Sequence, residues 1–243
     1  AWRSALSIEA MGEAFAAIHT ARPDIVILVD NCYGEFVEGR EPTAVGADVI
    51  VGSLIKNPGG GLAPTGGYAA GRADCISRIA QRLTVPGMGA EVGSYAGDYR
   101  PFYQGLFMAP HVTAQCVKGA ALFARVLELL GMETLPTSQA ERHDIIQAVR
   151  FSNAETLKAF CRTIQKAAPV DSFATPEPWD MPGYAAPVIM AAGTFVQGAT
   201  SELSADGPII EPYTAYLQGA LSYAHARIAA MMVSDACLSQ TNA

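Results

Sequence analysis

The sequence predicts an α/β fold, in which part of a domain with a parallel-rich sheet is followed by a smaller C-terminal α/β domain. Helical and strand-like segments alternate along the first half of the chain, which is typical of an α/β sheet. The run at 25–29 is a continuous series of aliphatic residues, as expected of a parallel strand buried on both faces. The pattern of the sequence changes after Gly131, so we expect two domains, at 1–131 and 132–243.

The first domain is expected to hold two helices and three strands. A helix begins after Ser7, which can cap it, and ends before Pro23 and Asp24. Residues 84–108 are rich in Gly, Pro and Tyr without clear periodicity, which predicts a long functional loop. The expected elements before this loop are a helix at 7–19, strands at 25–29, 48–53 and 66–71, and a helix at 73–83.

A long helix is predicted over 111–130, where the helical pattern is longest and Gly131 is suited to the position just past its end. The remaining expected elements are a strand at 144–149, a helix at 153–167, a proline-rich loop at 169–187, a strand at 188–192, a polar segment up to Pro212 that includes Glu202, Ser204 and Asp206, and a final helix from about 213 to 233.

Composition excludes several classes of protein. The chain has 243 residues, of which 50% are hydrophobic and 16% charged, so it can bury a core and is neither disordered nor a disulfide-stapled miniprotein. Its formal net charge is −7 and it has no basic run, so we expect no nucleic-acid partner. The longest apolar stretch, at 185–198, contains Pro187 and is too short to cross a bilayer, so we expect no membrane partner.

The five cysteines are widely spaced and contain no CxxC pair. This pattern favours free thiols in a reducing cytoplasm over disulfides or a metal site. No charged and apolar leader follows Ala1, which also favours a cytoplasmic location.

The most informative chemistry surrounds Lys56, which of the four lysines is the only one outside a helical pattern. Asp30 ends one predicted strand and Lys56 follows the next, so both side chains are expected in one crevice at the carboxyl edge of the sheet. A partly desolvated lysine loses its proton readily and can form an imine. Ser53 offers a hydroxyl, and the glycines at 59–61 would let the backbone approach a ligand closely. A lysine, an aspartate and phosphate donors are what pyridoxal phosphate requires, although each residue alone is also common in an ordinary turn.

Two long motifs carry a resemblance to a known family. VDNCYGEF at 29–36 and GSLIKNPGGG at 52–61 resemble the methionine γ-lyase-like or aluminium-resistance proteins, which are fold-type I pyridoxal-phosphate enzymes with carbon–sulfur lyase chemistry. Similar motifs continue to the last helix. The resemblance implies a fold-type I transferase-like architecture, with 1–131 as the C-terminal part of the large cofactor-binding domain. It also implies that the first third or more of a full-length enzyme lies upstream.

The resemblance further implies a role for each motif residue. Pyridoxal 5'-phosphate would be the cofactor, with Lys56 in a Schiff base to it, Asp30 on the pyridinium nitrogen and Ser53 on the phosphate. Asn31 belongs to the same motif, and Tyr33 is implied near the ring. Related cystathionine lyases have Asp-Asn-Thr here, and the cysteine that replaces the threonine in this chain offers no hydroxyl.

The implied reaction is elimination of a thiol from the β or γ carbon of a sulfur amino acid of the methionine, cystathionine or cysteine type. The catalytic Lys56 would remove the Cα proton. The proton donor to the leaving group stays open among Tyr33, Tyr68 and Tyr103, for which packing around a cleft is the alternative. The group that binds the substrate carboxylate stays open among Arg40, Arg82 and Arg100.

Two other interpretations stay open. The same cofactor supports aminotransferase or aldolase reactions, and a truncated homologue could bind no cofactor at all. The resemblance implies self-association into a dimer or tetramer, and the segment 84–108 is our candidate contact region.

Overall fold

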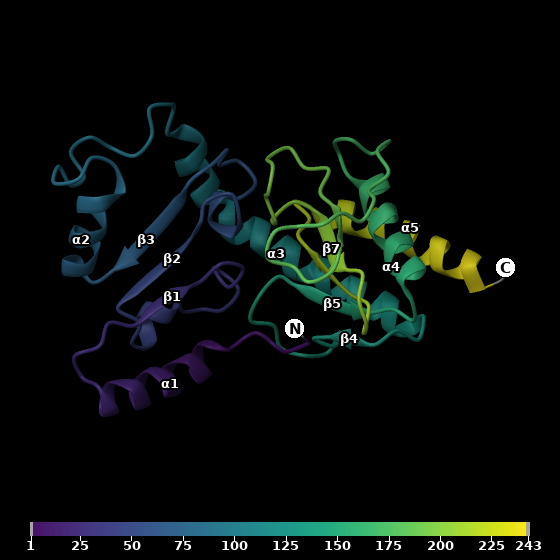
Figure 1. Ribbon diagram of the computed structural model, residues 1–243, viewed down its shortest axis with the longest axis horizontal. Coiled ribbons are helices and arrows are strands. Elements are labelled where there is room, and N and C mark those ends of the chain that lie inside the picture. Colours follow the sequence, from purple (N-terminus) through teal and green to yellow (C-terminus); the bar gives the residue numbers. More distant parts are fainter. Residues whose placement is uncertain (1, 242–243) are drawn as a thin grey trace.

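The computed structural model describes residues 2–241 and shows a mixed α/β fold, as predicted (Figure 1). The strands form two sheets, one of three strands in the order β1-β2-β3 and one of five in the order β4-β5-β8-β7-β6. The two sheets lie at opposite sides of Figure 1, and the long helix α3 (Arg100–Leu129) runs from one to the other.

The first sheet consists of β1 (Leu28–Asp30), β2 (Val49–Ser53) and β3 (Gly67–Gly71). Helix α1 (Ile8–Ala21) begins where predicted, because the Ser7 hydroxyl accepts a hydrogen bond from the backbone N–H of Ala10 at 3.0 Å. Helix α2 (Ala73–Leu83) also lies where predicted. The small core of this part contains Phe15, Ile27, Ala47 and Ile50.

The expected strand at 25–29 is wrong in both length and burial. β1 begins only at Leu28, which is 56% exposed, and Ile25 and Val26 are exposed as well. Among the described residues β1 pairs with β2 alone, so no second neighbour buries its other side. β1 and β2 are parallel but β2 and β3 are antiparallel, so the described strands do not form the expected parallel-rich sheet.

The long loop expected at 84–108 ends at Tyr99, because α3 begins at Arg100 and not at residue 111. Pro101 lies in the first turn of the helix, where no N–H donor is needed. The Asp98 carboxylate accepts the N–H of Arg100 at 2.9 Å and so supports this start. Pro110 is accommodated inside the helix, although in the sequence it marks a break.

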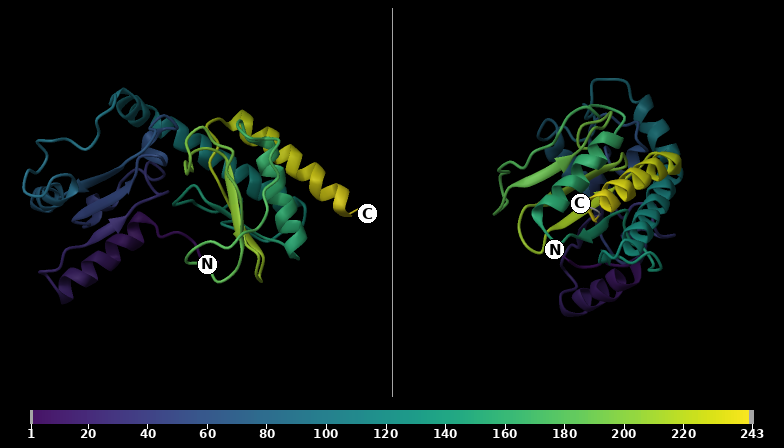
Figure 2. Two further views of the ribbon diagram at one scale, coloured as in Figure 1. Left: turned by 45° about the horizontal axis from the view of Figure 1, so that its top comes forward. Right: turned by 90° about the vertical axis from the view of Figure 1, so that its right-hand side faces the viewer.

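The second sheet is entirely antiparallel. Helices α3, α4 and α5 contribute to the same core as this sheet, with Phe123, Leu157 and Ala229 among its buried residues. α4 and α5 run beside one another in Figure 2. The elements are β4 (Thr134–Leu135), β5 (Gln147–Arg150), α4 (Ala154–Ala167), β6 (Val188–Ala191), β7 (Ser204–Pro208), β8 (Thr214–Gln218) and α5 (Tyr223–Thr241).

The predicted final helix from residue 213 is wrong at its start. Residues 214–218 form β8, a central strand between β5 and β7 in which Ala215 and Leu217 are buried. Pairing on both sides overrides the helical character of this segment. Gly219, with φ of 82°, follows the strand, and α5 begins at Tyr223.

Other strand predictions in this half need smaller changes. The polar segment before Pro212 contains β7, which was not expected, and β4 was not expected either. β5 begins at Gln147 and not at Asp144, whose carboxylate instead accepts the N–H of Ile146 at 3.0 Å in the preceding turn.

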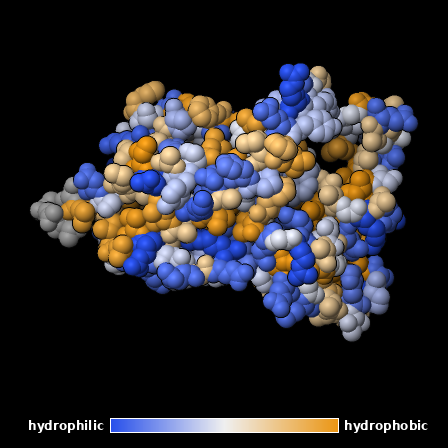
Figure 3. All heavy atoms as spheres, turned by 180° about the vertical axis from the view of Figure 1, so that it is seen from behind, coloured by the Kyte–Doolittle hydropathy of each residue, from blue (hydrophilic) through white to orange (hydrophobic). Residues whose placement is uncertain are grey.

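All five cysteines lie within the described residues, none of them forms a disulfide, and three are buried. No described helix is long and apolar enough to cross a membrane. No group of three or more His, Cys, Asp or Glu side chains that could hold a metal occurs between residues 2 and 241. Apolar side chains gather near the C-terminal end (Figure 3), where α5 exposes Ile228, Met231 and Leu238.

We predict that Gly105→Ala destabilises the protein, although alanine is normally the better helix former. A Cβ at Gly105 would lie 2.2 Å from the backbone oxygen of Gly59, so α3 must move away from that turn. The free energy of unfolding, measured with urea, should fall by about 1–3 kcal/mol. The neighbouring exposed Gln104→Ala should change it by less than about 0.5 kcal/mol. Equal stability of both variants would contradict the prediction.

Candidate active site

The candidate site lies where β1 and β2 end. The two strands are parallel and pair Asp30 with Val51, so their carboxyl ends meet at one edge of the sheet. Ser53 is the last residue of β2, and Lys56 follows in the turn that leads to the short 3₁₀ helix η2 (Asn57–Gly59). The pairing thus brings the two predicted strand ends together at one edge.

Lys56 is held by the turn that follows β1. Its half-buried ammonium donates a hydrogen bond to the hydroxyl of Tyr33 at 2.8 Å and lies 4.2 Å from the centre of that ring. The buried side chain of Asn57 donates to the backbone oxygens of Tyr33 at 3.1 Å and Glu35 at 3.0 Å. The turns after β1 and β2 are therefore joined by the side chains of Lys56 and of the residue that follows it.

Asp30 and Cys32 share the start of the first turn. One carboxylate oxygen of Asp30 accepts the backbone N–H of Cys32 at 3.1 Å, and the side chain of Asp30 is exposed. Burial, with a contribution from Asp30, raises the pKa of the Cys32 thiol to about 11. Cys32 is therefore a neutral thiol near pH 7 and a poor nucleophile.

Ser53 and Asn31 form hydrogen bonds within the protein. The Ser53 hydroxyl accepts the N–H of Ile55 at 3.3 Å and donates weakly to the backbone oxygen of Gly66 at 3.4 Å. Asn31 is buried, and its side-chain amide donates to Glu41 at 2.7 Å. Asn31 thus supports the turn that carries Tyr33, and it makes no hydrogen bond to Lys56.

The glycines that follow Lys56 approach protein and not an open ligand space, which corrects our expectation for them. A Cβ on Gly60, whose φ is 53°, would lie 2.4 Å from the backbone oxygen of Gly105 in α3. A Cβ on Gly61, whose φ is 74°, would lie 2.4 Å from the side chain of Leu221. The glycine-rich turn therefore docks the Lys56 segment onto α3 and onto the C-terminal half of the chain.

A buried acid lies behind this site, and sequence reasoning missed it. Glu35 is 3% exposed, accepts a hydrogen bond from the Tyr68 hydroxyl at 2.9 Å, and leaves its second oxygen without a partner. Burial raises the pKa of Glu35 to about 7, with a further contribution from the charge of Glu41. Gly52 makes room for the pair, because a Cβ there would lie 2.6 Å from the Glu35 carboxylate. No sequence signal distinguishes such a glutamate from an exposed one.

The structure separates the three candidate tyrosines. Tyr33 contacts Lys56, Tyr68 is bound to Glu35, and Tyr103 is exposed on α3. Burial and the neighbouring Glu35 raise the pKa of Tyr68 well above its usual value. The candidate arginines for a substrate carboxylate are all exposed, at Arg40, Arg82 and Arg100.

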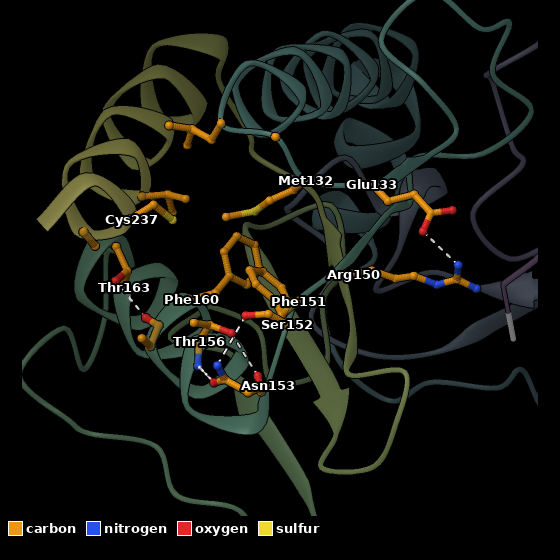
Figure 4. Close-up of a pocket in the computed structure, with 15 residues that line it drawn as sticks. Met132, Glu133, Arg150, Phe151, Ser152, Asn153, Thr156, Phe160, Thr163 and Cys237 are labelled. Carbon is orange, nitrogen blue, oxygen red and sulfur yellow. Dashed lines mark hydrogen bonds and ion pairs between the residues drawn. The ribbon is translucent and has the colours of Figure 1, made fainter. Parts of the chain in front are cut away.

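Two cavities of more than 500 Å³ lie away from Lys56. One of about 510 Å³ lies among β5, α4 and α5; Met132, Phe151 and Phe160 line it, and Arg150 is paired with Glu133 at 2.8 Å at its edge (Figure 4). A second, of about 610 Å³, lies between residues 3–10 and 135–148. Neither is lined by Lys56 or Asp30, so the candidate site rests on its chemistry and not on cavity size.

The acid behind the site predicts a dependence of stability on pH. Because the pKa of Glu35 is about 7 in the fold, against 4.5 ordinarily, the folded state keeps a proton that the unfolded chain has lost. The stabilisation is fully present below about pH 4.5 and is lost as the pH rises to about 7. Glu35→Gln should flatten this decrease between pH 5 and pH 8 in urea titrations, and the exposed Glu13→Gln should not. An unchanged slope in Glu35→Gln would contradict the assignment.

The comparisons with known proteins agree with the sequence motifs. The family model for methionine gamma-lyase matches residues 1–238. The uncharacterized protein YnbB of Bacillus subtilis is 50% identical over 236 residues, which cover 97% of this chain and 56% of that protein. The crystal structure of a carbon-sulfur lyase involved in aluminum resistance from Clostridium novyi NT is 51% identical with a TM-score of 0.92, over 98% of this chain and 56% of that one.

A more distant structure shares the fold alone. The pyridoxal-5'-phosphate dependent protein YhfS of Escherichia coli is 18% identical with a TM-score of 0.54, over 98% of this chain and 59% of that one. The chain spans 56% of the length of YnbB and of the clostridial lyase. With a family model matched over nearly its whole length, the chain belongs to the methionine gamma-lyase family.

Proposed function

We propose that this chain is the lysine-bearing part of a pyridoxal-phosphate-dependent enzyme that cleaves carbon–sulfur bonds of sulfur amino acids. Residues 1–131 would complete a cofactor domain, and residues 132–243 would form a smaller domain beside it. The observation that carries the proposal is the placement of Lys56 and Asp30 at the ends of two parallel strands. Membership of the methionine gamma-lyase family supports the lyase chemistry.

The residues present fit the cofactor. Neither Lys56 nor Asp30 forms an ion pair with another described residue, so one cation and one anion at this edge are left for a ligand. Pyridoxal phosphate offers a carbonyl to an amine and a ring nitrogen to a carboxylate, and when bound it supplies the electron sink for a carbanion at Cα. Lys56 would hold the first group, Asp30 the second, and the Ser53 hydroxyl the phosphate.

The side chains of this chain would then divide the work of proton transfer. Asp30 would keep a proton on the ring nitrogen. Lys56 would remove the Cα proton of the bound amino acid as a general base. Tyr33 lies at 2.8 Å from the lysine nitrogen and is placed to orient it and to pass a proton to the departing thiol.

The overall reaction breaks the bond between sulfur and the β or γ carbon. The thiol leaves with a proton, and hydrolysis of the remaining unsaturated amine yields a keto acid and ammonia. The substrate class comprises methionine, cystathionine and cysteine, with β- and γ-elimination both possible at such a site.

We further propose that a second copy of the protein covers the start of α3. Tyr103, Leu106 and Phe107 recur at helical spacing and are all exposed, with Phe107 83% exposed. The preceding loop exposes Val85, Met88 and Val92 close by in the sequence. This apolar segment is the part of the expected contact region that suits a dimer or tetramer interface.

Lys56→Ala should abolish cofactor binding, because no other amine of the described residues lies at the end of β2. The measurement is the visible absorbance band of the protein expressed from its complete coding sequence after addition of pyridoxal phosphate. Lys158→Ala, which removes an ion pair with Glu155 on α4, should keep the band. Absence of the band in the unsubstituted protein would refute the proposed function. Keto-acid release without an added amino acceptor separates a lyase from an aminotransferase.

Phe107→Glu should shift the protein towards the monomer in sedimentation velocity, because a charge would be buried in the interface. The matched control is Phe173→Glu, since Phe173 is 87% exposed and lies in the C-terminal half. An unchanged sedimentation coefficient in Phe107→Glu would show that this face lies outside any interface.

A further inference from the structure

One loop of the C-terminal half lies against the segment that carries Lys56. A Cβ on Gly198 would be 3.3 Å from Cδ1 of Ile55, the residue just before the lysine. Leu221, from the same half of the chain, packs on Gly61 after the lysine. Residues 194–198, here called the facing loop, therefore border the candidate site from the second sheet's side.

A buried carboxylate holds the facing loop in shape. Glu202 is 1% exposed, and its two oxygens accept the backbone N–H groups of Phe195 at 2.7 Å and Val196 at 3.0 Å. The Thr194 hydroxyl donates to the backbone oxygen of Val196 at 2.9 Å. Burying a carboxylate is costly unless donors replace its water, and here both donors come from one short loop.

The backbone around Glu202 is fixed by contacts with α3 and with the segment that follows β8. The backbone oxygen of the adjacent Ser201 accepts hydrogen bonds from the N–H of Ala220 at 3.0 Å and the thiol of Cys116 at 3.4 Å, the latter from α3. A Cβ on Gly219 would lie 2.2 Å from the backbone oxygen of Glu202, so these two segments are in backbone contact. The carboxylate is thus anchored to the core and reaches out to the loop.

We propose that Glu202 is a positioning residue, which fixes the facing loop as the wall that an amino-acid substrate meets beside Lys56. This inference rests on the proposed function. Within the facing loop Phe195 is 67% exposed and residues 197–198 are exposed as well, so these residues would be the parts of the wall that meet a substrate side chain. Glu202 acts through the loop and touches neither the lysine nor the substrate.

The test is Glu202→Gln, which has the same shape but turns an NH2 group towards one of the two N–H donors. We expect KM for the amino acid to rise roughly tenfold or more, the scale of a lost charge-assisted hydrogen bond. The cofactor band and kcat should stay close to those of the unsubstituted protein. Chymotrypsin should cleave after Phe195 faster, because the N–H groups of the loop are no longer held.

Two other variants control the result. Asp206→Asn alters a half-buried acid on β7, the strand that follows Glu202, and should leave KM and cleavage unchanged even where it lowers the melting temperature. Gly198→Ala disturbs the facing loop without changing Glu202, because its φ of 80° disfavours a side chain, and it should raise KM as well. It decides the question if Glu202→Gln does not fold.

The outcomes are distinguishable. An unchanged KM in Glu202→Gln or Gly198→Ala, with the cofactor band present, would overturn this inference and leave the proposed function standing. Unchanged cleavage after Phe195 in Glu202→Gln would show that the carboxylate does not hold the loop. Failure of the proposed function would instead appear as a missing cofactor band in the unsubstituted protein.

Discussion

Backbone meets backbone where α3 crosses the turn that follows Lys56. Gly59 and Gly60 on one side and Gly105 on the other allow an approach that any side chain would prevent. Through this contact the first sheet is joined to the helix that also enters the core of the second sheet. The position of Lys56, and of the facing loop beside it, depends on α3 staying at this distance.

The polar residues near Lys56 fall into two groups, those that are available to a ligand and those that hold the turn after β1. Asp30 and Lys56 form no ion pair with another described residue, although each is hydrogen-bonded to the turn after β1, at Cys32 and Tyr33 respectively. The side chains behind them bind one another and the backbone of that turn. Asn57, Asn31 and Glu41 hold the turn that carries Tyr33. Rigid support of this kind is what a site needs if two charged side chains are to stay available in one geometry.

Much of the first half was predictable because its signals are local. The cap at Ser7 and the periodicity of α2 depend on neighbours within a turn or two. The structure differs from the sequence prediction where contacts between distant residues determine the secondary structure. β8 is a strand because β5 and β7 flank it, and α3 begins before the predicted start although Pro110 lies within it. The positions of Lys56, Asp30 and Ser53 at or just after strand ends could be predicted from the sequence, whereas burial of Glu35 and Glu202 has no sequence pattern.

The proline inside α3 has a mechanical consequence. Pro110 has no N–H, so the backbone oxygen of Leu106 lacks its normal helical donor. A helix bends most easily where a backbone hydrogen bond is missing. This point lies one turn beyond Gly105, which is fixed to the Lys56 turn, and before the part of α3 buried in the second core. Bending at the proline would change the angle between the part of the chain that contains the first sheet and the part that contains the second. The distance between the facing loop and Lys56 would change with it, while Gly105 stays in contact with the turn after the lysine.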